Sequence, residues 1–93
     1  MKKVISEVQI VPVKPNNGLV AFASFVLNEE LYLGSIGIFT RLNKPGFRIT
    51  YPTRKVGNIN IQIFHPITKE LSEEINRSIL EKTENILGSL KQD

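Results

Sequence analysis

The sequence contains no cysteine, no tryptophan, one methionine and one histidine, His65. Without cysteine the chain has no disulfide bond, no thiolate zinc site and no cysteine nucleophile, and it suits a reducing compartment. What remains is ordinary for a globular protein, with 41% hydrophobic and 23% charged residues. We expect the 93 residues to form a single domain, residues 1–93, with one core.

Residues that commonly build active sites are equally scarce. His65 precedes Pro66 at a predicted helix start, where we expect it to help satisfy free backbone groups. Glu29 and Glu30 are adjacent in a polar turn and point in different directions, so they do not form a catalytic pair. No set of histidine and carboxylate residues has metal-ligand spacing, and no glycine-rich phosphate loop occurs. The sequence predicts a protein that is not an enzyme and binds neither metal nor cofactor.

Long apolar runs are also missing. No segment approaches the roughly 18 apolar residues that a membrane span needs. Lys2 and Lys3 could begin a signal peptide, but Glu7 and Gln9 interrupt the apolar segment and no small-residue cleavage site follows. We therefore expect a cytoplasmic protein with no membrane partner.

Acidic residues are absent from the middle of the chain. Residues 31–69 contain six cations and no carboxylate, whereas residues 70–93 contain three cations and six anions. The six cations are Arg41, Lys44, Arg48, Arg54, Lys55 and Lys69. Such clustering of positive charge is the electrostatic pattern of polyanion binding. A solvated basic surface without a ligand is the alternative that charge alone leaves open.

Alternation of apolar and polar residues predicts five strands, at residues 3–13, 19–27, 31–39, 47–51 and 59–64. In the first, Val4, Val8 and Ile10 share a face, and Pro12 indicates an edge position. Residues 14–18 are a strong turn signal. Residues 19–27 are apolar at nearly every position, which is typical of a central strand covered on both faces.

Glycines and a change of period complete the fold prediction. Gly34 and Gly37 in the third strand indicate a bulge or a close approach by another part of the chain. After Pro66 the apolar residues follow a helical period; they are Leu71, Ile75, Ile79, Leu80, Ile86, Leu87 and Leu90. We predict the α+β class, with an antiparallel sheet of about five strands followed by a long C-terminal amphipathic helix. The apolar stripe exceeds the width of such a sheet, so we expect a homodimer in which a sheet edge and this stripe meet a second subunit.

The cations at the break in residues 49–67, ITYPTRKVGNINIQIFHPI, are the candidate ligand-binding group. Pro52 removes a ladder donor and is expected to end the fourth strand, so that Thr53, Arg54 and Lys55 lie on a loop of about six residues. A hydroxyl, a guanidinium and an ammonium on one short loop suit phosphate contacts. Further positive charge would come from Arg48, Arg41 and Lys44. Alternatively, these cations only protect a sheet edge from aggregation.

Several motifs in order resemble the septation regulator SpoVG family over about residues 3–87. They are Ala21 to Leu31 (AFASFVLNEEL), Gly46-Phe47, Tyr51-Pro52-Thr53-Arg54-Lys55 and His65-Pro66-Ile67. The resemblance implies a small dimeric α+β protein of the bacterial cytoplasm that binds nucleic acid and regulates gene expression, septation and sporulation. By the same resemblance, Thr53, Arg54 and Lys55 match the hydroxyl-plus-two-cations motif of the family, and His65-Pro66 matches its helix start.

Two segments depart from the family pattern. The third strand reads Gly34 to Ile38 where the family usually carries Asp or Arg, and the helix begins with Glu70, Glu73 and Glu74 where the family has cations. Carboxylates there repel phosphate, which shifts the expected nucleic-acid contacts, to DNA or RNA, onto residues 41–55. The alternative function is a non-enzymatic adaptor whose basic loop docks an acidic protein partner.

Overall fold

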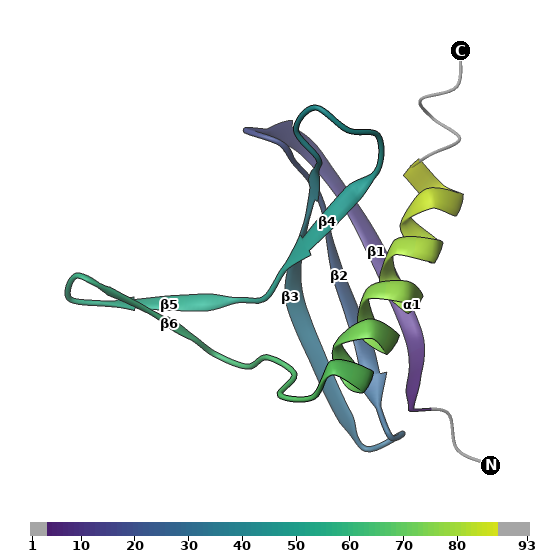
Figure 1. Ribbon diagram of the computed structural model, residues 1–93, viewed down its shortest axis with the longest axis vertical. Coiled ribbons are helices and arrows are strands. Elements are labelled where there is room, and N and C mark those ends of the chain that lie inside the picture. Colours follow the sequence, from purple (N-terminus) through teal and green to yellow (C-terminus); the bar gives the residue numbers. More distant parts are fainter. Residues whose placement is uncertain (1–3, 88–93) are drawn as a thin grey trace.

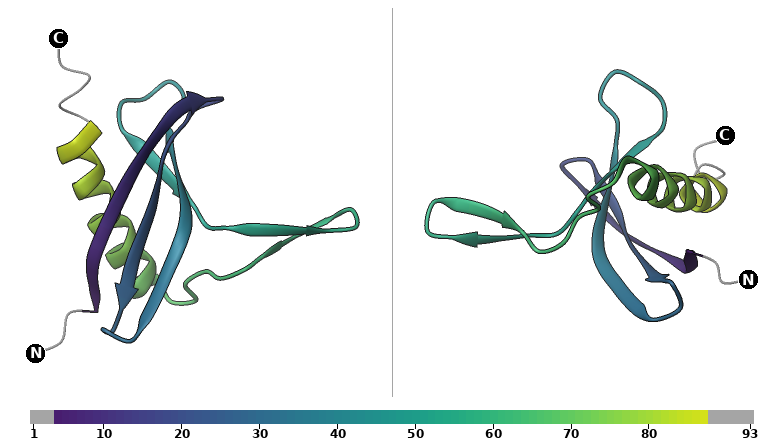
Figure 2. Two further views of the ribbon diagram at one scale, coloured as in Figure 1. Left: turned by 180° about the vertical axis from the view of Figure 1, so that it is seen from behind. Right: turned by 60° about the horizontal axis from the view of Figure 1, so that its bottom comes forward.

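The computed structural model describes residues 4–87, which form six strands and one helix (Figure 1). The elements are β1 (Ile5–Asn16), β2 (Leu19–Leu27), β3 (Leu31–Thr40), β4 (Phe47–Thr50), β5 (Thr53–Val56), β6 (Ile59–Gln62) and α1 (Lys69–Leu87). Strands β1 to β4 form one antiparallel sheet in the order β1-β2-β3-β4, while β5 and β6 form a separate two-stranded sheet. Helix α1 packs on one face of the larger sheet (Figure 2), which confirms the predicted α+β class.

Tight turns fix the register of the first three strands. Asn17 and Gly18 both have positive φ, +54° and +93°, as a two-residue hairpin turn requires. The turn predicted at residues 14–18 is therefore present but confined to these two residues, because β1 extends to Asn16. Asn28 and Glu29 repeat this conformation between β2 and β3. The amide of Asn28 also donates a hydrogen bond of 2.8 Å to the carbonyl of Val4, which ties this turn to the start of β1.

Strand β1 lies at the edge of the sheet, as Pro12 indicated. Its predicted face is partly wrong: Val4 is exposed, and Ile5 is buried instead. The pairing with β2 shifts between Ser6 and Gln9, and Glu7 adopts a φ of +50°. One extra residue at such a bulge reverses the alternation, so Ile5 points to the same side as Val8 and Ile10.

Strand β2 lies at the centre of the core but is covered fully on one face only. Ala21, Ala23 and Phe25 are buried in the cluster that contains Ile75 and Ile79 of α1. Phe22, which points to the opposite side, is 40% exposed. The prediction that both faces of residues 19–27 are covered therefore holds only for the helix side. We call the side of the sheet away from α1 the open face.

Both features predicted for β3 are present. Ser35, next to Gly34, has a φ of +61°, and the pairing with β2 shifts between Ala23 and Phe25, which identifies a bulge. Gly37 sits opposite Thr50 of β4, where a Cβ would lie 2.9 Å from the Thr50 Oγ1 atom. A side chain at position 37 would therefore displace its neighbours.

Helix α1 begins later than the sequence indicated. The Oγ1 atom of Thr68 accepts a hydrogen bond of 3.2 Å from the amide of Leu71, so Thr68 is the N-cap and the helix starts at Lys69. His65 does not cap the helix, since its Nδ1 atom donates to the carbonyl of the adjacent Pro66 at 3.0 Å. The predicted contact of His65 with a backbone group beside Pro66 is present, but the helix starts only at Lys69, and Thr68 caps it.

The apolar stripe of α1 packs against its own chain. Ile75, Ile79 and Leu87 are buried, while Leu71, Leu80 and Ile86 are partly buried against the same core. Fully burying one such side chain contributes roughly 1.5–3 kcal/mol. Leu90, the last residue of the predicted stripe, lies outside the described residues. The described part of the stripe is thus occupied within one chain, and large exposed apolar side chains lie mainly on the strands and connecting segments.

Candidate nucleic-acid interface

Strands β5 and β6 form a hairpin that projects from the rest of the molecule, and we call residues 53–62 the arm (Figures 1 and 2). Gly57 has a φ of +63° at the first position of its two-residue turn, a conformation that glycine adopts without steric conflict. At the other end, the amide of Ile63 donates to the carbonyl of Pro52 at 2.9 Å. Every strand residue of the arm is exposed.

The register of the arm divides its side chains between two faces. Thr53 pairs with Gln62, Arg54 with Ile61, Lys55 with Asn60, and Val56 with Ile59. Because cross-strand partners share a face and successive residues alternate, two groups result. The polar face carries Thr53, Lys55, Asn60 and Gln62. The apolar face carries Val56, Ile59 and Ile61 together with Arg54.

This arrangement corrects the prediction that Thr53, Arg54 and Lys55 lie together on a loop. They belong to a strand, so Thr53 and Lys55 share one face while Arg54 points to the other. The cause is visible in the sequence, because Gly57-Asn58 is a two-residue hairpin signal between two strand-forming segments. Pro52 ends β4 as expected, but the chain re-enters a strand immediately afterwards.

The arm is anchored to the body by two aromatic residues at its root. The rings of Tyr51 and Phe64 meet edge to face with centroids 5.9 Å apart, and both pack against the core. The Tyr51 hydroxyl is buried and has no hydrogen-bond partner, and burial raises the pKa of this group above 10.0. An apolar root of this kind fixes the direction of the arm although its strands are solvated.

Arg48 lies on the open face of the main sheet. Its Cζ atom is 4.7 Å from the centroid of the Phe39 ring, directly across the β3–β4 ladder. A guanidinium over an aromatic face is held by the ring quadrupole, worth about 0.5–1 kcal/mol at exposed sites. Arg48 is therefore a positioned cation on β4, the strand that leads into the arm root.

Arg41 and Lys44 are separated from the arm in a single chain. Both lie in the β3–β4 connection, where the amide of Arg41 donates to the carbonyl of Gly46 at 3.2 Å. This connection and the arm leave opposite ends of β4 (Figure 1). The six predicted residues thus divide into three sites: the arm, Arg48 on the sheet, and the distant loop.

The acidic helix lies away from the arm in all the views of Figures 1 and 2. One of its carboxylates, Glu74, is paired with Arg77, with an Nη2–Oε2 distance of 2.6 Å. That hydrogen bond and the negative charge of Glu74 raise the pKa of Arg77. The repulsion expected from the acidic first turns therefore acts on a different side of the molecule.

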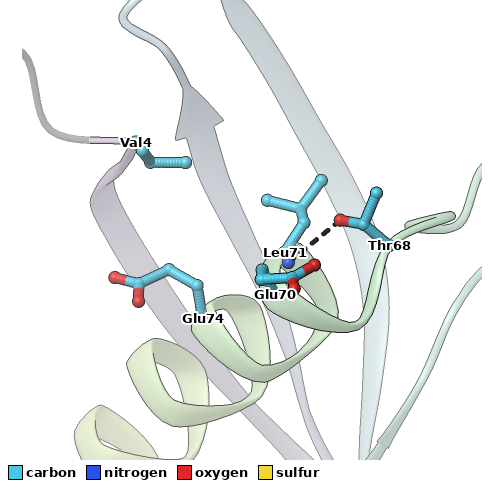
Figure 3. A pocket seen from close by; sticks show the side chains of 5 residues that line it. All are labelled: Val4, Thr68, Glu70, Leu71 and Glu74. Carbon is cyan, nitrogen blue, oxygen red and sulfur yellow. Dashed lines mark hydrogen bonds between the residues drawn. The ribbon is translucent and has the colours of Figure 1, made fainter.

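A shallow hollow lies between the start of β1 and the first turns of α1 (Figure 3). Its lining combines Val4 and Leu71 with Thr68, Glu70 and Glu74. The Thr68 hydroxyl is already engaged as the helix cap, and the lining residues that belong to the described chain include no cation. Within residues 4–87 no cluster of three or more metal-ligating side chains occurs. The described lining of this hollow is therefore acidic and apolar, unlike the basic arm.

Asn60 and Gln62 were missed by sequence reasoning as candidate site residues. Their period-two spacing had placed them opposite the isoleucines of the same strand. What the pattern lacked was the partner strand, which brings both amides next to Thr53 and Lys55.

Among residues 4–87, no helix combines the length and apolar character needed to cross a membrane.

Comparison with known proteins identifies the family of this chain. The SpoVG family model matches residues 2–85. A relative from Treponema denticola, a septation protein SpoVG by name, is 32% identical over 78 residues, which cover 83% of this chain and 82% of that protein. The chain belongs to the SpoVG family.

Proposed function

We propose that this chain is a homodimeric nucleic-acid-binding regulator of gene expression that acts in septation and contacts phosphates through the arm. One observation carries the proposal: the arm is exposed, bears Arg54 and Lys55, and contains no carboxylate. Positive charge on a projecting hairpin reaches a polyanion without bringing the acidic helix close. The role in septation rests on family membership and on the name of the Treponema denticola relative.

The expected salt dependence follows from the number of phosphates contacted. Two cations per arm and two arms per dimer would neutralise four phosphates. The logarithm of the binding constant on duplex DNA would then fall with the logarithm of salt concentration with a slope of roughly −0.9 × 4, or about −3.6. Affinity would decrease roughly tenfold for each doubling of salt.

The test is binding of fluorescent duplex DNA, single-stranded DNA and RNA at two salt concentrations, with wild type and Arg54→Glu/Lys55→Glu. We expect the variant to lose most affinity and most of the salt slope. The matched control is Lys69→Glu/Lys82→Glu, which changes net charge equally on exposed positions of α1. Equal binding by wild type and the arm variant at both salt concentrations would contradict the proposal.

Self-association is proposed through the apolar face of the arm rather than through the helix. Val56, Ile59, Ile61 and the adjacent Ile63 are 50–66% exposed. A two-stranded hairpin is marginally stable in water, so covering this face stabilises the arm. In a two-fold dimer the same face of each copy meets the other. Arg54 shares this face, and we propose that its stem lies along the apolar contact while its guanidinium stays in solvent and reaches a phosphate. A monomeric mass at micromolar concentration would argue against this part of the proposal.

A protein–protein adaptor is the second candidate, and the same exposed apolar face favours it. An acidic protein with an apolar strip could cover the isoleucines and pair with Arg54. Comparing retention on mixed oligonucleotides with pull-down of protein partners separates the two functions. Loss of oligonucleotide retention below physiological salt, together with a discrete partner that survives it, would favour the adaptor.

A further inference from the structure

We propose that the polar face of the arm reads base edges in the major groove of double-stranded DNA, with Asn60 and Gln62 as the specificity residues. This inference rests on the proposed nucleic-acid binding and deepens it. Phosphate contacts by cations position a protein on DNA but carry no sequence information. Asn60 and Gln62 supply a different chemistry on the same hairpin.

The four polar side chains form a compact patch. Thr53 stands directly opposite Gln62, and Lys55 directly opposite Asn60. Such partners have Cβ atoms about 5 Å apart, and the two pairs are separated by about 7 Å along the strands. That length spans about two base-pair steps of 3.4 Å. One arm therefore suits a site of two to three base pairs.

The chemistry of the patch matches base edges better than phosphates alone. A side-chain amide offers a donor and an acceptor together, which allows a bidentate contact to adenine, and a lysine donates to guanine. The patch contains two amides, one ammonium and one hydroxyl, and no carboxylate. A face built only for phosphate would need donors alone, so the acceptors of Asn60 and Gln62 are unused by phosphate binding.

The shape of the arm selects the groove. Four residues per strand give a ribbon about 13 Å long at 3.3 Å per residue, and its two strands lie about 4.8 Å apart, so the ribbon can lie flat in a major groove about 12 Å wide. The B-form major groove admits a two-stranded ribbon, whereas the deep and narrow major groove of A-form RNA does not. With the polar face toward the bases, the apolar face turns away from the DNA.

The experiment begins with selection of wild-type ligands from random pools of duplex DNA and of RNA. We expect enrichment from the DNA pool of one short common sequence, because two arms packed through their apolar faces point their polar faces in opposite directions, so that each arm reads a duplex alone. Affinities are then measured for an enriched duplex and a scrambled one. For Asn60→Ala/Gln62→Ala, the preference for the enriched duplex should fall by about tenfold or more. Binding to the scrambled duplex and its salt slope should stay unchanged.

The control variant Gln9→Ala/Asn85→Ala removes the same two amides from exposed positions outside the arm and should retain the preference. Circular dichroism and the solution mass verify that each variant keeps fold and assembly. If wild type binds the pools without enriching a DNA sequence, or if Asn60→Ala/Gln62→Ala keeps its preference, groove reading is overturned while phosphate binding stands. Enrichment from the RNA pool instead of the DNA pool also overturns it. Absence of binding to either pool overturns the proposed function as well.

Discussion

The body of the molecule, β1 to β4 with α1, differs from the arm in what its apolar residues touch. In the body, Phe25, Ile36, Ile38 and Ile79 are fully buried in one cluster. In the arm, Val56, Ile59 and Ile61 are at least half exposed although they alternate as regularly as any core strand. Identical side chains thus stabilise the fold in one region and remain available for contact in the other.

The contrast between body and arm extends to charge. The helix that covers the body carries most of the acidic residues of the described chain, whereas both charged residues of the arm, Arg54 and Lys55, are cations. The aromatic pair Tyr51–Phe64 connects the two regions and holds the arm away from α1. The body therefore supplies the stability of the fold and the arm supplies the candidate binding surface. Mutations in one region should affect one property and leave the other unchanged.

The largest effect on the free energy of unfolding is expected from truncating a core side chain of the body. Ile79→Ala removes a fully buried residue from the contact between α1 and the sheet. Such a substitution loses both transfer free energy and packing, so the free energy of unfolding should fall by about 2–5 kcal/mol. Urea unfolding followed by far-ultraviolet circular dichroism measures it. A decrease below about 1 kcal/mol would contradict the core position assigned to Ile79.

The turn of the arm should give the next largest effect, confined to the arm. Gly57→Ala places a side chain at a φ of +63° with no heavy atom nearby, so strain comes from the backbone alone. That strain is roughly 1–2 kcal/mol. Amide hydrogen exchange should become about 5–30-fold faster in the arm and stay unchanged in α1. Gly18→Ala, at a φ of +93° in the β1–β2 turn, is the matched control and should instead lower the stability of the body.

Much of this fold could be predicted from sequence, because the apolar residues of the body alternate in the strands and follow helical spacing in α1. The turn at Asn17-Gly18, the edge position of β1, the bulge beside Gly34 and the helix over residues 69–87 all follow from local signals. Local signals did not predict that Ile5 is buried instead of Val4. The bulge at Glu7 reverses the inward and outward alternation of every residue before it in β1. Binary pattern alone does not locate such an insertion.

The candidate site was predicted less completely, because the sequence does not show which strands pair with each other. Lys55 and Arg54 could be recognised by charge, but their directions depend on whether residues 53–56 form a loop or a strand. Alternation in residues 59–62 predicted a strand without indicating its partner. Only the pairing of β5 with β6, apart from the main sheet, leaves the isoleucines uncovered and gathers the polar side chains.

A smaller effect is expected at the junction of the two regions. Tyr51→Phe removes a buried hydroxyl that has no partner, so stability at neutral pH should change by less than about 1 kcal/mol. Burial raises the Tyr51 pKa in the folded state, so the folded protein retains its phenolic proton at pH values where the unfolded chain has lost it. Wild-type stability should therefore decline as pH rises past 10.0, the ordinary value of tyrosine. Chemical unfolding across this range should show a weaker decline for Tyr51→Phe; parallel curves would exclude Tyr51 as the cause.

The smallest change in the free energy of unfolding is expected when the deletion made in the body is repeated in the arm. Ile61→Ala removes the same atoms as Ile79→Ala, but from a residue that is 50% exposed. In dilute solution, where the chain is monomeric, the free energy of unfolding should change by no more than about 0.5 kcal/mol. If the apolar face of the arm is covered by a second copy, association stabilises wild type by mass action. The difference in the free energy of unfolding between Ile61→Ala and wild type should then increase with protein concentration. For Ile79→Ala, the loss due to the core contact should be present in full even in dilute solution. Unfolding curves measured over a hundredfold range of concentration distinguish the two behaviours, and a concentration-independent Ile61→Ala difference would place the dimer contact elsewhere.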